Sequence, residues 1–283
     1  NLVQRGKAAW ERIQAFLRPP WAVPDSGTLA VVDDHRLEVK IQSFSYPGRT
    51  QPALADLAFT LAPGRTLGIV GPTGSGKSTL LALLARFYEA PGVRIRLGGR
   101  ELAAYRLDAL REAVSLVMQE SMLFSDTLRE NLVLSRPEAD DAAVMAAVRM
   151  AALDRDLAQL PAGLATEVGE RGVTLSGGQR QRLCLARALL GEARILLLDD
   201  ALSAVDAETE HRILGELERH TRHLSRIVVS HRLSALQSAE EILVLREGCV
   251  AERGTHAALL AAGGWYAQTW RYQQLAATVE QRA

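Results

Sequence analysis

The chain has 283 residues, and its 33 basic and 33 acidic side chains cancel to a formal net charge of zero. This balance argues against a dedicated nucleic-acid surface, so we expect no nucleic-acid partner. The length is sufficient for a large core with an additional lobe. Cys184 and Cys249 lack metal-ligand spacing and fit a reducing compartment, and no stretch approaches the roughly 18 uninterrupted apolar residues of a membrane helix.

The N-terminal segment is predicted to be a helix followed by a linker. Apolar side chains recur at helical spacing over residues 1–18. Pro19-Pro20 ends the helix because proline cannot continue its hydrogen bonding, and the Pro-Asp-Ser-Gly run at 24–27 is typical of a linker. We therefore expect a short N-terminal segment at 1–33 and one domain at 34–283.

A glycine-rich run at residues 71–79 follows the pattern G-x-x-x-x-G-K-[ST]. An apolar run at 67–70 precedes it and predicts a strand, and residues 80–84 predict a helix, which is the context that a phosphate-binding loop requires. Glycines let successive N–H groups point at an anion, and the helix N-terminus adds its positive dipole end. In such a loop the lysine reaches the β- and γ-phosphates and the Ser hydroxyl ligates Mg²⁺. The expected phosphate-binding residues are Thr73, Gly74, Ser75, Gly76, Lys77, Ser78 and Thr79.

A second motif lies in a mostly helical block that we place at about residues 121–190. The block contains an alanine-rich helix predicted over 142–153 and a second helix over 180–190. The second helix is preceded by Ser176, a suitable N-cap, and by Gly177, Gly178 and Gln179. One nucleotide does not need two phosphate-binding helix ends from one chain. The arrangement is expected if two such domains pair head-to-tail, each covering the nucleotide held by the other.

Strands return in the C-terminal third, where we predict them at 194–198, 226–230 and 241–245. Residues 246–248 are predicted to turn the last of these into a hairpin. Interleaved strands and helices indicate a mostly parallel sheet. The expected fold is an α/β P-loop NTPase with a mostly parallel core sheet, an antiparallel β portion and a separate helical lobe that carries the second motif.

From about His35 to the C-terminus, the order of these motifs resembles the nucleotide-binding domain of ATP-binding cassette (ABC) proteins. The resemblance implies ATP and Mg²⁺ as cofactors. It implies that Tyr46 stacks on adenine, that residues 175–179 form the signature, and that Asp206 lies in the D-loop and contacts nucleotide. Mg²⁺ would be held by Ser78, Gln119 and Asp199, and the catalytic residues would be Asp200, His231 and Gln119.

Each of these residues has a structural alternative when it is considered alone. A tyrosine before proline, such as Tyr46, is usually a half-buried residue at a strand end. Gln119 after a strand is usually a polar cap, and a lone histidine such as His231 is more often structural than catalytic. Asp199 ends an apolar strand, which is where α/β sheets place ligands. Their joint occurrence in one chain favours the functional interpretation of all four.

Three further segments resemble the exporter branch of the family: residues 166–172 just before the signature, residues 122–131, and residues 3–13. The last resembles the cytoplasmic end of a final transmembrane helix. The resemblance implies a cytosolic portion of a longer membrane protein, whose full-length chain would supply transmembrane domains at the cytoplasmic face of the inner membrane. An importer ATPase, a non-transport ABC ATPase and a non-catalytic regulatory module are the alternatives; a non-transport ATPase is expected to carry long coiled-coil insertions or a tandem cassette.

One residue departs from the family pattern. Most active members carry Glu after the Walker B strand, whereas this chain has Asp200. The Glu carboxylate polarises the attacking water and must lie within about 3 Å of it. Asp is one methylene shorter, which could withdraw the carboxylate oxygen by more than about 1 Å, and a misplacement of about 1 Å can lower a rate by ~10²-fold. The alternative is that the backbone shifts and Asp functions. With an intact signature, Asp here is typical of the weakened half of a heterodimeric multidrug-type exporter, so we expect a second, non-identical nucleotide-binding domain as partner.

Overall fold

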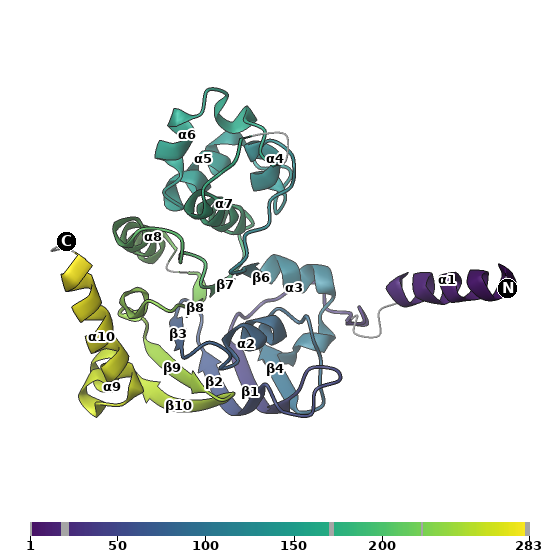
Figure 1. Cartoon of the computed structure of the whole chain (residues 1–283), viewed down its shortest axis with the longest axis horizontal. Coiled ribbons are helices and arrows are strands. Elements are labelled where there is room, and N and C mark those ends of the chain that lie inside the picture. Colours follow the sequence, from purple (N-terminus) through teal and green to yellow (C-terminus); the bar gives the residue numbers. More distant parts are fainter. Residues whose placement is uncertain (1, 18–22, 170–172, 222, 281–283) are drawn as a thin grey trace.

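The computed structural model describes residues 2–17, 23–169, 173–221 and 223–280. Figure 1 shows two sheets below a separate helical lobe, with helix α1 and helix α10 on opposite sides of the molecule. Helix α1 covers Leu2–Leu17, as predicted, while Pro19-Pro20 lies outside the described residues. Every helix in the described ranges is too short or too polar to cross a bilayer.

The larger sheet has the strand order β10-β9-β3-β8-β7-β6 among the described residues. All neighbouring pairs from β9 to β6 are parallel, and only the β9–β10 pair is antiparallel. Strands buried on both faces need continuous apolar runs, which are supplied by residues 67–70 of β3, 195–198 of β7 and 227–229 of β8. The bounds are β3 Thr66–Val70, β6 Val114–Val117, β7 Ile195–Asp199, β8 Ser225–Val229, β9 Glu241–Arg246 and β10 Cys249–Gly254.

The smaller sheet is antiparallel, with the order β2-β1-β4-β5. Its β1 and β2 strands bury alternate side chains, as expected of a sheet with one solvated face. The buried face packs with helix α2, Lys77–Leu84, in a core that also includes Leu67 and Ile69 of β3. Helix α2 is thus held in one core with residues from both sheets. The bounds are β1 Leu37–Phe44, β2 Leu54–Leu61, β4 Val93–Leu97 and β5 Arg100–Glu101, followed by η1 Leu102–Ala104 and α3 Leu107–Ala113.

The helical lobe lies within the block predicted at about residues 121–190. It comprises α4 Leu128–Val133, α5 Asp141–Met150, α6 Asp154–Gln159, η2 Gly163–Ala165 and α7 Gly177–Leu190. Side chains of Thr127, Asp140 and Ser176 cap α4, α5 and α7. Helix α5 ends three residues before its predicted end at Leu153, because Ala152 adopts a left-handed conformation with φ 54°.

The C-terminal part confirms the predicted strands to within one residue and the predicted hairpin. Glu247 and Gly248 both have positive φ, as a tight hairpin turn requires. Helix α8 Ala207–His220 follows β7, the short helix η3 Leu233–Leu236 follows β8, and α9 His256–Ala262 and α10 Trp265–Glu280 end the described chain. The predicted α/β fold with parallel core, antiparallel portion and helical lobe is confirmed.

The linker lies against the domain. The carbonyl of Pro24 accepts a hydrogen bond from Arg86 Nη2 at 3.1 Å, and the Asp25 carboxylate accepts from the backbone N–H of Leu107 at 2.9 Å. Arg86 is buried just after α2 and also donates to the carbonyl of Tyr105. The N-terminal segment is therefore attached to the domain next to the end of helix α2.

Candidate active site

The carboxyl ends of four adjacent parallel strands carry the predicted site residues. The sheet order places β3, β8, β7 and β6 side by side. The phosphate-binding loop follows β3, and His231 comes two residues after β8. Asp199 is the last residue of β7, and Asp200 follows it. Gln119 comes two residues after β6. This edge of an open α/β sheet is where ligands bind. Segments separated by more than a hundred residues are therefore brought to one edge.

Lys77 is buried within the loop that it is expected to serve. Its Nζ donates to the carbonyls of Gly71 and Pro72, each at 2.9 Å. Burial lowers the pKa of Lys77 below its ordinary value, while the nearby carboxylates of Asp199 and Asp200 act in the opposite direction. The ammonium is thus close to both carboxylates and is held at the loop by backbone oxygens.

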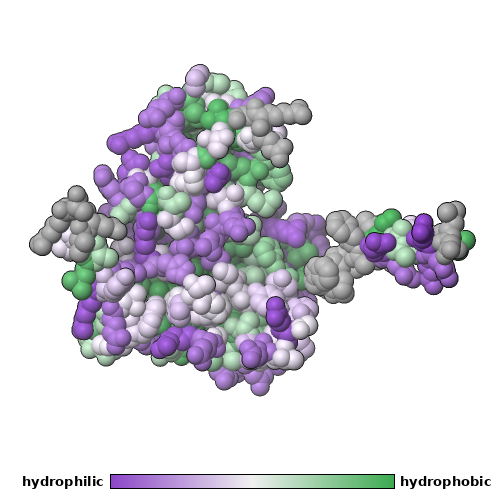
Figure 2. All heavy atoms as spheres, in the orientation of Figure 1, coloured by the Kyte–Doolittle hydropathy of each residue, from purple (hydrophilic) through white to green (hydrophobic). Residues whose placement is uncertain are grey.

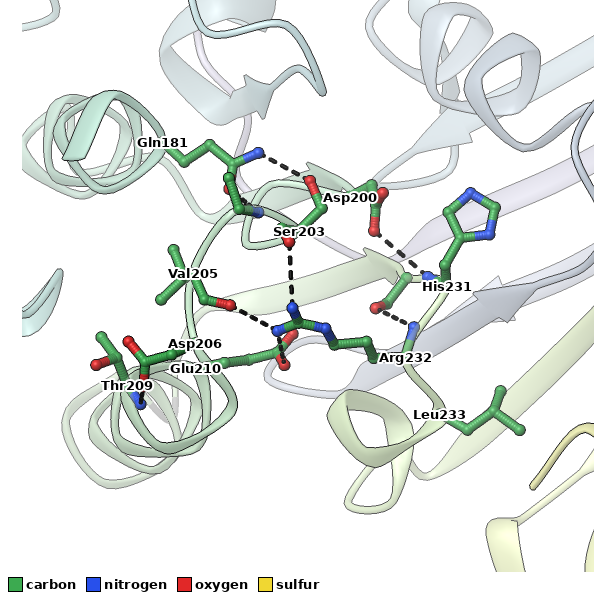
Figure 3. Close-up of polar contacts among 12 residues, drawn as sticks. Gln181, Asp200, Ser203, Val205, Asp206, Thr209, Glu210, His231, Arg232 and Leu233 are labelled. Atoms are coloured by element: carbon green, nitrogen blue, oxygen red, sulfur yellow. Dashed lines mark hydrogen bonds and ion pairs between the residues drawn. The ribbon is translucent and has the colours of Figure 1, made fainter. Parts of the chain in front are cut away.

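The two carboxylates after β7 have different surroundings. Burial raises the pKa of Asp199, and the Ser78 hydroxyl, which hydrogen-bonds to it, acts against that rise. Asp200 is 8 % exposed and adopts φ 49°, and its Oδ1 accepts from the backbone N–H of His231 at 3.4 Å. Aspartate tolerates this left-handed conformation better than most residues do. Asp200 therefore faces the backbone of the segment after β8, as Figure 3 shows.

The residues present fit a magnesium nucleotide. The N-cap of α2, Gly76, has φ 100° and no side-chain cap, so the first N–H groups of the helix are left for a ligand. A Cβ at Gly76 would lie 2.6 Å from Leu54 Cδ2, so only glycine fits there. The buried Ser75 hydroxyl also has no hydrogen-bond partner among the residues that the structure describes. The Ser78 hydroxyl and the Asp199 carboxylate are oxygen ligands of the kind that Mg²⁺ prefers.

Tyr46 is fixed at the side of helix α2. Its hydroxyl donates to Thr79 Oγ1 at 3.0 Å, and its ring makes edge contacts with Phe44 and Tyr88, each with centroids 5.2 Å apart. The motif predicted a phosphate contact for Thr79 and gave no sign of its hydrogen bond with the Tyr46 hydroxyl.

We expect Tyr46→Ala to weaken MgATP binding and Tyr46→Trp to preserve it, because stacking uses the face of the ring. A base–aromatic stack is worth about 1–3 kcal/mol in nucleic-acid sites. Titration calorimetry on both variants measures the effect, and Tyr88→Ala controls for loss of the aromatic cluster. Equal affinity of Tyr46→Ala and wild type would show that the ring is only structural.

The predicted N-cap of the signature helix is confirmed. Ser176 Oγ accepts from Gln179 N–H at 3.2 Å, and Gln179 Oε1 accepts from Ser176 N–H at 2.9 Å, which completes a capping box on α7. A Cβ on Gly178 would lie 2.8 Å from the carbonyl oxygen of Ala204, so this glycine also allows the D-loop to approach. The contact of Ser176, Gly177, Gly178 and Gln179 with a nucleotide stays a prediction.

The D-loop, residues 203–206, is held by side chains that sequence reasoning missed (Figure 3). From the signature helix, Gln181 donates to Ser203 Oγ and accepts from Ala204 N–H, each at 2.9 Å. From beyond β8, Arg232 donates to the carbonyls of Val205 at 2.7 Å and Ser203 at 3.2 Å. The signature helix and the segment after β8 are thus connected through one loop. The only sequence signal was the position of Arg232 directly after His231.

Arg232 also forms an ion pair within the chain, with Glu210 at 3.0 Å. Burial raises the pKa of Glu210, and Arg232 opposes that rise. Asp206 caps helix α8 by accepting from Thr209 N–H at 2.8 Å, so it has a structural role whether or not it contacts nucleotide.

Gln119 lies on the side of the site toward the helical lobe. It is exposed and lines a pocket of about 590 Å³ with Val168, Gly177 and Gln181. The exporter-like loop 166–172 borders this pocket through Val168 and Gly169, while residues 170–172 lie outside the described residues. The assignment of Gln119 to Mg²⁺ or to catalysis stays a prediction.

Comparison with known proteins decides the family. A family model described as ABC transporter matches residues 54–203. The chain belongs to the ABC transporter family. The match spans the phosphate-binding loop, Asp199, Asp200, the signature and the start of the D-loop, whereas Tyr46 and His231 lie outside it.

Individual relatives agree with this membership. The chain is 46% identical over 280 residues to the multidrug resistance-like ATP-binding protein MdlA of Escherichia coli K12, covering 99% of the chain and 48% of that protein. It is 41% identical to the probable multidrug resistance ABC transporter ATP-binding/permease protein YheI of Bacillus subtilis, covering 97% and 47%. An ATP-dependent lipid A-core flippase of Xanthomonas oryzae is 42% identical over 94% of the chain and 45% of the flippase.

The fold agrees as well. A bacterial Atm1-family ABC exporter with ATP bound superposes with a TM-score of 0.82 at 41% identity, covering 89% of this chain and 44% of the exporter chain. This ABC domain therefore spans about half the length of the curated relatives that it matches.

Proposed function

We propose that this chain is the ATP-binding and ATP-hydrolysing motor domain of an ABC exporter, which dimerises head-to-tail to drive export across a membrane. The observation that carries the proposal is the assembly of Lys77, Ser78, Asp199, Asp200 and His231 at adjacent strand ends, next to a helix whose N-terminus has no side-chain cap. The solved structure that the chain resembles is described as an ABC exporter, which supports the direction of transport.

Each residue of the proposed site has a role in nucleotide binding or hydrolysis. The open N-terminus of α2 and Lys77 bind the phosphates, while Ser78 and Asp199 hold Mg²⁺, with Gln119 joining from the lobe side. Tyr46 orients the base. Bound Mg²⁺ and ATP supply the charge neutralisation and the transferable phosphoryl group. Asp200 would orient the attacking water, and His231, which is exposed, would contact the γ-phosphate.

We propose further that this domain is the weakened half of a heterodimer. Asp200 stands where a Glu is expected, and in this structure its carboxylate accepts from the backbone N–H of His231. The signature motif, by contrast, is complete and its capping box is formed. In a head-to-tail pair, Ser176, Gly177, Gly178, Gln179 and Asp206 would then serve the nucleotide bound to a partner that carries Glu.

The contact with the membrane domains is proposed at an apolar surface near Gln119. Met118, Met122 and Phe124 are 44%, 62% and 55% exposed in the segment that links β6 to the lobe. In Figure 2 hydrophobic residues are visible on the helical lobe, and others lie on the lower part of the molecule. Exposed apolar clusters mark interaction sites, and intracellular helices of transmembrane domains in the full-length chain would cover this one. The domain would then lie at the cytoplasmic face of the inner membrane.

The dimerisation step is tested by light scattering coupled to size-exclusion chromatography. With Asp200→Asn in this chain, and with the partner's catalytic Glu replaced by Gln so that neither site turns over, MgATP is expected to convert the chain, alone or mixed with its partner subunit, from monomer to dimer, because the nucleotide supplies contacts to both helix ends. With MgADP the chain is expected to remain a monomer. The additional substitution Lys77→Ala is expected to prevent dimerisation with MgATP. An unchanged mass with MgATP, both alone and with the partner, would refute head-to-tail pairing.

A further inference from the structure

The C-terminal helix α10 reaches the segment after β8 through one side chain. Gln273 Oε1 accepts from the backbone N–H of Leu233 at 3.0 Å, and Gln273 Nε2 donates to the carbonyl of His231 at 2.7 Å. Gln273 is partly buried, whereas its neighbours Tyr272 and Gln274 are exposed. One amide therefore holds the backbone on both sides of Arg232.

The backbone N–H of Leu233 would otherwise lack an acceptor within its own helix. Helix η3 begins at Leu233, and its N-cap residue Arg232 provides no side-chain cap. The first N–H groups of a helix have no intrahelical acceptor, and Gln273 supplies one from 40 residues along the chain. The amide thus acts as a cap that comes from a different element.

The first turn of α10 is held against the rest of the domain, so the helix that carries Gln273 is fixed at its start. The Glu252 carboxylate accepts from the backbone N–H groups of Trp265 at 2.5 Å and Tyr266 at 3.3 Å. Tyr266 is fully buried, and its hydroxyl lies 2.8 Å from His256 Nδ1. Figure 1 shows α10 rising from α9 along the outer edge of the molecule.

The His231 backbone is held from the other directions too. Its N–H donates to Asp200, and the next residue, Arg232, is tied to the D-loop. Figure 3 shows the His231 imidazole pointing away from the Arg232 guanidinium, and the ring is exposed. The backbone contacts therefore fix the position from which this ring projects.

We propose that Gln273 is a positioning residue for His231, through which the C-terminal helix keeps the imidazole directed at the γ-phosphate. The inference rests on the proposed nucleotide site. The proposal predicts a selective effect. Substitution of Gln273 weakens the binding of a nucleotide that has a γ-phosphate and leaves unchanged the binding of a nucleotide that lacks one.

The test is calorimetry of the whole chain with the Mg²⁺ complexes of a non-hydrolysable ATP analogue and of ADP. Gln273→Ala and His231→Ala are each expected to weaken the analogue roughly 2- to 10-fold, the range of one neutral hydrogen bond, and to leave MgADP unchanged. The double variant is expected to bind like His231→Ala alone, because coupled residues are not additive.

Two further variants complete the design. Gln274→Ala, on the exposed neighbour in the same helix, is expected to match wild type. Gln273→Glu keeps the acceptor and the side-chain size but loses the N–H donor, and is expected to show the same selective loss even if the alanine variant folds poorly. Equal weakening of both nucleotides, no weakening of either, or full additivity with His231→Ala would overturn the inference. Absence of nucleotide binding by wild type would overturn the proposed function and this inference with it.

Discussion

Lys77→Ala is expected to weaken MgATP binding by about 10- to 100-fold, since hydrogen bonds to charged groups contribute about 1.5–3 kcal/mol. In the structure the ammonium is buried, bonds to the carbonyls of Gly71 and Pro72, and lies close to Asp199 and Asp200. Its removal deletes the cation aimed at the phosphates and takes away a positive charge that interacts with two carboxylates. Both effects act against an anionic ligand.

Calorimetry with MgATP measures this loss. Lys40→Ala is the matched control, because Lys40 is exposed on β1 and its removal changes the net charge equally. It is expected to bind as wild type does. Equal affinity of Lys77→Ala and Lys40→Ala would refute the assignment of the 71–79 loop as the phosphate site.

Asp200→Glu is expected to raise ATP turnover of a forced homodimer, by up to ~10²-fold if carboxylate reach is what limits the rate. Asp200 follows directly on β7 and is nearly buried, so the backbone at this position is fixed by the sheet: its N–H donates to the carbonyl of Val229 at 2.9 Å. With the backbone fixed, one added methylene moves the carboxylate outward from the sheet edge, where the water would lie.

The measurement is steady-state ATPase activity, with nucleotide affinity determined in parallel. The expected signature is a rise in kcat with little change in affinity, since the substitution affects the water and not the phosphates. Asp33→Glu, an exposed position, controls for the substitution type. Unchanged or lower turnover with intact binding would mean that Asp200 is adequate as it stands.

The sheet and the phosphate loop were predictable because their signals are local. Buried parallel strands require unbroken apolar runs, and β7 and β8 differ from their predicted bounds by one residue. The Ser176 cap was likewise visible within four residues of sequence. Helix α5 was predicted too long because an alanine-rich run carries no stop signal and its end depends on the left-handed Ala152.

The connections among the site elements could not be predicted. Gln181, Arg232 and Gln273 each bond to backbone groups 20 or more residues away. Apart from the position of Arg232 directly after His231, nothing in the local pattern distinguishes them from ordinary polar residues on a helix or loop, because their partners come into reach only when the sheet order and the helix packing are set. The same holds for Arg86, which fixes the linker at Pro24.

Ser176 requires a careful control in any test of the paired sites. Its side chain caps α7, so Ser176→Ala removes a cap worth about 1 kcal/mol as well as a candidate nucleotide contact. Thr255 caps α9 in the same way, by accepting from Ala258 N–H. Thr255→Ala therefore reproduces the loss of a cap away from the signature and is expected to leave ATPase activity unchanged.

The steady-state ATPase activity of the heterodimer, reconstituted with a partner that carries Glu, tests the central claim most directly. Ser176→Ala in this chain is expected to depress turnover on the order of 10²-fold, as loss of one transition-state donor does, because Ser176 serves the partner's competent site. Asp200→Asn is expected to depress it only mildly, because its own site contributes little turnover. If Asp200→Asn abolishes turnover while Ser176→Ala leaves it intact, the two sites are not divided in this way and Asp200 is an ordinary catalytic base.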